Sequence, residues 1–151
     1  DQYVEGAIMV PFVGSHDVSR FSSRADPGTA DEWNQWVEQG LPGQPGTDDP
    51  YRASLQAHGW LLTTPGAPMI YMGDEYGEFG GADPDNRHMW RDNQSLNERE
   101  SNLQENISQL GVLRSELESL RRGGYQSIFN SSDVVVYHQR LQQLRYVCGS
   151  D

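Results

Sequence analysis

A histidine and an aspartate, His16 and Asp17, follow a short apolar run and could together do acid–base or electrostatic chemistry. In α/β proteins, side chains at the carboxyl ends of strands commonly line a ligand site, because strands there give way to loops at one edge of the sheet. A histidine that only hydrogen-bonds a neighbouring aspartate gives the same two letters. The pair alone therefore leaves a functional and a structural interpretation open.

A second apolar run, residues 68–72, also ends in acidic side chains, Asp74 and Glu75. A continuous apolar run is typical of a parallel strand covered on both faces. Adjacent residues on a strand point to opposite faces, so these two carboxylates could not easily address one reacting atom. We predict structural roles for both.

Three segments, in this order, resemble motifs of the α-amylase family of glycoside hydrolases. Residues 12–17 resemble its phenylalanine-x-x-asparagine-histidine-aspartate signature, with Ser15 where the family usually has asparagine. Residues 66–75 resemble its glycine-x-proline-x-isoleucine-tyrosine-x-glycine-aspartate-glutamate signature. Residues 83–87 resemble the aspartate-proline-x-x-arginine loop of its cyclomaltodextrinase-like and neopullulanase-like members. The resemblance covers roughly residues 8–140 and corresponds to the end of a complete family enzyme.

The resemblance implies an α/β fold that consists of the last two βα units of a (β/α)8 TIM barrel and the start of an antiparallel β C-terminal domain. Residues 1–125 are expected to form the C-terminal part of the catalytic barrel, and residues 126–151 the start of a truncated β-rich domain. In such a barrel the chemistry lies where strands end and loops begin. We expect Asp17 and the loop of residues 83–87 at that end.

The resemblance also implies a retaining glycoside hydrolase that acts on α-linked glucans. Asp17 resembles the family's third carboxylate, which stabilises positive charge at the anomeric carbon in the transition state. His16 resembles its sugar-contacting neighbour. The alternative for Asp17 is a structural salt bridge with Arg20 or Arg24.

Asp83 and Arg87 resemble a pair that contacts glucose one or two units from the cleaved bond. A salt bridge that stabilises the loop would have the same spacing, so this alternative stays open. Trp33 and Trp36 lie in a long polar segment that suits a loop over a site. They could stack on sugar rings, but loop tryptophans more often anchor the loop to the core, and we predict the anchor.

Retaining hydrolysis needs a nucleophile and a general acid, which in the family lie on earlier strands. The isolated chain is therefore expected to be inactive, with an α-linked glucan and the N-terminal part of the same barrel as partners. Self-association through open strand edges is a further hypothesis. The alternative function is a non-catalytic carbohydrate-binding or assembly module, which His16 and Asp17 disfavour because packing a sheet requires neither.

The net charge of −11 and the absence of lysine exclude a basic stripe, so nucleic-acid binding is disfavoured. No apolar run approaches the ~20 residues of a membrane span. The single cysteine, Cys148, excludes an internal disulfide, and the localisation stays open. We predict no cofactor and no metal, because the histidines are too scattered for a metal motif: His16, His58, His88 and His138.

The pattern predicts alternating strands and helices. A short strand is expected over about residues 12–15, and a helix is expected to begin with Asp49 as its cap and Pro50 at its first position. One face of this helix should carry Tyr51, Leu55, His58 and Leu62.

A second helix is expected from Ser101, whose spacing to Gln104 matches a capping box, to Gly123–Gly124. Its apolar residues recur at helical spacing, which indicates packing on a sheet rather than a coiled coil: Leu103, Ile107, Leu110, Leu113, Leu117 and Leu120. Residues 133–138 should form a strand.

Overall fold

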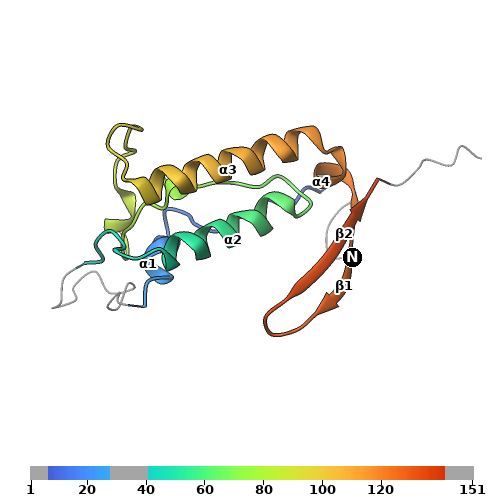
Figure 1. Ribbon diagram of the computed structural model, residues 1–151, viewed down its shortest axis with the longest axis horizontal. Coiled ribbons are helices and arrows are strands. Elements are labelled where there is room, and N and C mark those ends of the chain that lie inside the picture. Colours follow the sequence, from blue (N-terminus) through green and yellow to red (C-terminus); the bar gives the residue numbers. More distant parts are fainter. Residues whose placement is uncertain (1–6, 28–40, 142–151) are drawn as a thin grey trace, which may run out of the picture.

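The computed structural model describes residues 7–27 and 41–141 (Figure 1). Two long helices, α2 (Asp49–Thr63) and α3 (Glu98–Glu116), run side by side. The other elements are two short helices, two 3₁₀ turns and a two-stranded hairpin: α1 (Phe21–Arg24), η1 (Asp74–Tyr76), η2 (Asp85–Arg87), α4 (Glu118–Arg122), β1 (Gly124–Asn130) and β2 (Val135–Arg140). Among the described residues, no helix is long and apolar enough to cross a membrane.

The apolar core lies between α2 and α3. It consists of four buried side chains and three partly buried ones: Tyr51, Leu62, Leu103 and Ile107, with Leu55, Ile70 and Leu110 packed against them. The predicted apolar face of α2 is confirmed, because His58 is also buried. The core position predicted for α3 is confirmed for Leu103 and Ile107, but they pack against α2 and not on a sheet, and Leu113 and Leu117 are exposed.

Both helix starts differ from the prediction. The N-cap of α2 is Asp48 and not Asp49, and its carboxylate accepts from Arg99 at 2.6 Å instead of capping the helix. Helix α3 begins at Glu98, ahead of Ser101, because Asn97 and Glu100 form a reciprocal capping box. The helix then stops at Glu116, where the extended backbone of Leu117 separates it from α4.

The two predicted strands are reduced to one short parallel contact. The Ala67 N–H donates to Met9 O at 2.8 Å, the Met69 N–H donates to Pro11 O at 2.9 Å, and Phe12 forms a bridge with Met69. A regular strand over 12–15 was therefore wrong, although the parallel direction agrees with a βα unit. Coverage on both faces was also wrong, since Phe12, Met69 and Met72 are exposed.

The chain after α4 forms an antiparallel hairpin in which β1 pairs with β2. The predicted strand over 133–138 is confirmed in part by β2, whereas β1 was not predicted. The rings of Tyr125 and Tyr137 lie 4.8 Å apart, and the hydroxyls of Tyr137 and Thr63 hydrogen-bond the hairpin to the end of α2. Every residue of β1 is exposed.

The buried guanidinium of Arg114 joins the ends of the helices. It donates to the carbonyls of Leu62, Thr64, Gly66 and Leu120 at 2.7 to 3.0 Å. Burial lowers the pKa of Arg114, and the nearby charge of Arg121 lowers it further. The four carbonyls accept the hydrogen bonds of the Arg114 guanidinium. In return, the guanidinium supplies a donor to carbonyls at the end of α2 that have no partner within the helix.

We expect Arg114→Met to destabilise the chain by about 3 kcal/mol, since it keeps the aliphatic stem but leaves buried carbonyls without a donor. Urea unfolding followed by circular dichroism measures this. Arg122→Met is the matched control, because Arg122 is 79% exposed and pairs only distantly with Glu118, at 3.8 Å. It should cost under about 0.5 kcal/mol. Equal losses in the two variants would contradict a role for the carbonyl contacts.

Candidate active site

Residues 9–12 form the first paired segment, and residues 67–69 form the second. His16 and Asp17 lie in the turn that follows the first paired segment. Their side chains are 62% and 72% exposed, and His16 Nε2 lies 3.2 Å from Asp17 Oδ1. The pair is thus open to solvent rather than a buried structural contact. The catalytic role of Asp17 and the sugar-binding role of His16 stay predictions.

Ser15 shapes the turn that presents this pair. Its hydroxyl accepts from the Asp17 N–H at 3.2 Å, and its carbonyl accepts from the Val18 N–H at 3.5 Å. Asparagine and serine side chains both accept from backbone amides two residues on. Serine can therefore serve this turn where the family usually has asparagine.

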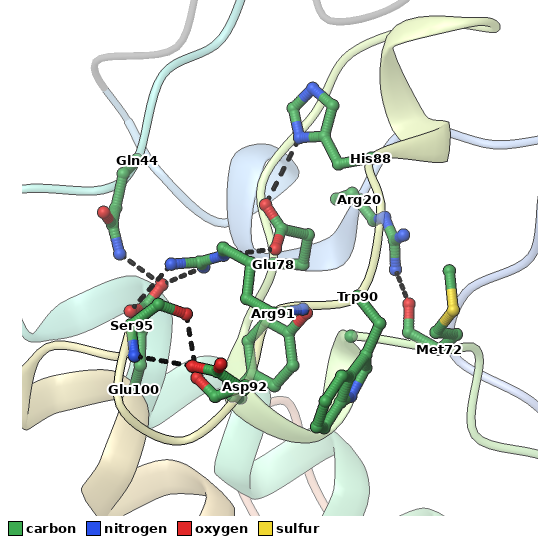
Figure 2. A network of polar contacts seen from close by, with 12 residues as sticks. Arg20, Gln44, Met72, Glu78, His88, Trp90, Arg91, Asp92, Ser95 and Glu100 are labelled. Atoms are coloured by element: carbon green, nitrogen blue, oxygen red, sulfur yellow. Dashed lines mark hydrogen bonds and ion pairs between the residues drawn. The ribbon is translucent and has the colours of Figure 1, made fainter.

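Arg20 is buried and joins three segments, and Figure 2 shows its contact with Met72. Its Nη1 donates to Met72 O at 2.7 Å and to Asp74 Oδ1 at 2.9 Å, while its Nε donates to Asn86 O at 2.8 Å. The guanidinium also lies over the ring of Tyr71, 4.2 Å from the centroid. These contacts place the ends of both paired segments and the loop around Asn86 against one cation.

The alternative role of Asp17, a salt bridge to Arg20 or Arg24, was wrong. Arg20 pairs with Asp74, and Arg24 Nη2 donates to Val13 O at 3.1 Å. The charge of the Asp17 carboxylate is therefore not compensated by either arginine.

Asp74 is buried and has the structural role predicted for it. The reason given for that role does not hold, because Asp74 and Glu75 lie in the 3₁₀ turn η1 rather than on a strand. A Cβ on Gly14 would lie 2.2 Å from Asp74 Oδ2, so this close approach requires glycine. Burial raises the pKa of Asp74, and the Arg20 guanidinium opposes that shift.

Sequence reasoning missed Asn86, which is fully buried in η2. Its Nδ2 donates to His16 O at 2.9 Å and to Val18 O at 2.8 Å. These two carbonyls flank Asp17. The only signal in the sequence is that Asn86 occupies an unspecified position of the aspartate-proline-x-x-arginine motif.

Asp83 and Arg87 form the salt bridge that was the alternative to sugar contact. Arg87 Nε lies 2.8 Å from Asp83 Oδ1, and the side chains are 53% and 47% exposed. The contact stabilises the loop, and its exposure keeps the pair accessible to a ligand. Sugar contact by Asp83 and Arg87 stays a prediction.

A buried acidic network ties this loop to α3 (Figure 2). Arg91 Nε donates to Glu78 Oε2 at 2.9 Å, and its terminal nitrogens donate to Glu100, which also accepts from Gln44. His88 Nδ1 lies 3.2 Å from Glu78 Oε1. Burial opposes the charge of Arg91, but the hydrogen bonds to Glu100 and Glu78 outweigh it and raise its pKa. The network therefore requires a charged Arg91.

The structure does not test the predictions for the two loop tryptophans, but it shows a contact of a third one. Trp33 and Trp36 lie outside the described residues. Trp90, which the sequence reasoning did not consider, donates from Nε1 to Glu75 Oε1 at 2.9 Å and remains half exposed. Glu75 Oε2 accepts from the Gly73 N–H at 2.7 Å, so Glu75 anchors this indole to the second paired segment.

Comparison with known proteins gives the class. No protein-family model matches the chain. An amylopullulanase from Thermoanaerobacter thermohydrosulfuricus is 30% identical over 129 residues, which are 85% of this chain and 8% of that protein. The crystal structure of an α-amylase from Geobacillus thermoleovorans, complexed with acarbose, matches with a TM-score of 0.67 and 26% identity over 89% of this chain and 25% of that one.

A cyclomaltodextrinase shares the fold at a TM-score of 0.62 and 23% identity, over 88% of this chain and 19% of its own. The fold is thus of the kind found in amylolytic glycoside hydrolases. The chain is related to the α-amylase family and spans less than a tenth of the length of the amylopullulanase that it matches.

We expect the stability of the chain to fall relative to that of Asp74→Asn as the pH rises above about 4. Because burial raises the pKa of Asp74 above its ordinary value of 3.8, the folded state binds the proton more tightly than the unfolded state. This stabilisation is fully present below the unfolded pKa and is lost as the pH rises through the folded pKa.

Urea unfolding of both proteins between pH 3.5 and pH 7, expressed as the difference in unfolding free energy at each pH, tests this expectation. The variant retains an acceptor for Arg20 and removes the titration. If the wild type instead becomes more stable relative to Asp74→Asn as the pH rises, the Arg20 ion pair outweighs burial in its effect on the pKa of Asp74.

Proposed function

We propose that this chain supplies one part of the active site of a retaining glycoside hydrolase acting on α-linked glucans. Asp17 is the carboxylate that stabilises the transition state, and His16 contacts the sugar beside it. The observation that carries the proposal is the exposed His16–Asp17 pair, presented at the carboxyl end of a parallel-paired segment and supported from beneath by Asn86 and Arg20.

The chemistry follows from charge. Glycoside cleavage passes through an oxocarbenium-like transition state, so positive charge develops at the anomeric carbon. The carboxylate of Asp17 has neither Arg20 nor Arg24 as a counter-ion. Its attraction to the sugar therefore grows as the positive charge develops, which lowers the barrier rather than only tightening substrate binding.

The nucleophile and general acid come, by the family resemblance, from earlier strands of the same barrel. The exposed apolar side chains in and just after the paired segments, Phe12, Met69 and Met72, support such a partner, since parallel strands are normally covered on both faces. We therefore propose that the chain is the C-terminal part of a catalytic barrel and is inactive alone. Residues 126–151, of which the structure describes 126–141, begin its β-rich domain.

Asp83 and Arg87 are proposed to contact the glucan away from the cleaved bond. Arg87 engages Asp83 through Nε, so the salt bridge orients the half-exposed guanidinium of Arg87. The matched relatives are named as an amylopullulanase, an α-amylase complexed with acarbose and a cyclomaltodextrinase, which supports an α-glucan as the substrate class.

In the complete enzyme that carries this chain, Asp17→Asn should lower kcat for maltotriose by roughly 10²–10³-fold, because the amide lacks the stabilising charge. Release of reducing sugar measures this. Asp133→Asn, in the exposed hairpin turn, is the control and should keep full activity. Arg87→Ala should raise KM more than it lowers kcat.

The purified chain alone should release no sugar, which separates it from a complete hydrolase. Two results would refute the proposal. One is undiminished kcat in the Asp17→Asn enzyme. The other is activity of the isolated chain that Asp17→Asn abolishes, because the chain would then supply its own nucleophile and acid.

Self-association of the isolated chain through its open strand edges would be a second way to cover the exposed apolar side chains of the paired segments. If it occurs, light scattering should give a mass above the 17.0 kDa of one chain, and Phe12→Ser combined with Met69→Ser should restore that mass. Both side chains are exposed, so the double variant should leave the α2–α3 core intact. A monomeric wild-type chain at working concentration would exclude self-association.

A further inference from the structure

We propose that Asn86 is a positioning residue that sets the location of Asp17, an inference that rests on the proposed function of Asp17. The Asn86 side chain is fully buried and donates to His16 O at 2.9 Å and to Val18 O at 2.8 Å. One amide nitrogen thereby holds the carbonyls of the two residues on either side of Asp17. The Val18 N–H of the intervening peptide group is itself bonded to Ser15 O at 3.5 Å, so the backbone on both sides of Asp17 is restrained and with it the direction of the Asp17 Cα–Cβ bond.

Asn86 can act in this way because its own backbone is held. Its carbonyl accepts from Arg20 Nε at 2.8 Å, and Arg20 is in turn bonded to Met72 O and Asp74. Arg20 also donates its backbone N–H to Gly80 O at 2.9 Å. The support for Asp17 therefore passes through one buried amide to a cation that also holds the end of the second paired segment.

The chemistry of the site selects asparagine. Both acceptors are carbonyls, so the group between them must supply two N–H donors from a short side chain. Aspartate has the same shape but no donor when ionised, serine has one donor, and glutamine needs an extra methylene in a site with no exposed surface. The backbone carbonyl that accepts from Arg20 survives any of these substitutions.

Loss of this support should affect catalysis more than binding. A displacement of about 1 Å in a catalytic group can cost on the order of 10²-fold in rate. Asn86 lies beneath the turn and has no surface through which to touch a sugar. We therefore expect Asn86→Asp to lower kcat of the complete enzyme by about 10²-fold, with KM changed by less than about threefold.

A readout independent of activity comes from ¹⁵N relaxation of the isolated 151-residue chain. The amides of Asp17 and Val18 should have order parameters near 0.85 in the wild type and below about 0.6 in Asn86→Asp. The matched control is Asn106→Asp, an identical change at an exposed asparagine of α3. This control should leave the turn and kcat unchanged.

The outcomes separate this inference from the proposed function. Disorder of the turn together with a selective loss of kcat supports a positioning role for Asn86. Unchanged order parameters, or disorder without loss of kcat, overturn it even when Asp17→Asn is inactive. Full activity of Asp17→Asn refutes the proposed function instead, and the relaxation data still report whether Asn86 holds the turn. Should Asn86→Asp fail to fold, Asn86→Ser, which introduces no buried charge, replaces it in the same measurements.

Discussion

The buried guanidinium of Arg20 is the constraint on which the candidate site depends. A buried cation is costly unless it is paired and hydrogen-bonded, and Arg20 is held by Asp74 and by the carbonyls of Met72 and Asn86 through Nη1 and Nε. Because these partners come from separate segments, satisfying one charge brings the segments together. The exposed side chains of His16 and Asp17 thus lie above a layer of buried polar groups rather than above an apolar core.

Two other arginines serve the same purpose elsewhere in the chain. Arg114 gathers carbonyls at the ends of the helices, and Arg91 joins Glu78 to Glu100. A guanidinium presents five donors in a fixed fork, so one side chain can satisfy acceptors from several directions. This geometry explains how a chain with an apolar content of 35% and without lysine can hold long loop segments in place.

The sequence predicted what is carried by local patterns and missed what depends on tertiary contacts. The core face of α2 follows from spacing and is present, whereas the structural role of Asp74 rests on its tertiary contact with Arg20 and not on the strand geometry from which it was predicted. The capping box was predicted at Ser101 but lies at Asn97, because several polar residues there have the same spacing. Asn86 could not be recognised, because its importance lies in bonds to carbonyls about 70 residues away.

The hairpin of β1 and β2 extends beside the helices rather than over them (Figure 1). All residues of β1 are exposed, and the hairpin meets α2 through the hydroxyls of Thr63 and Tyr137. A two-stranded ribbon that buries so little surface is only marginally stable by itself. We therefore expect the hairpin to unfold at a lower free energy than the helical pair and the Arg20 layer.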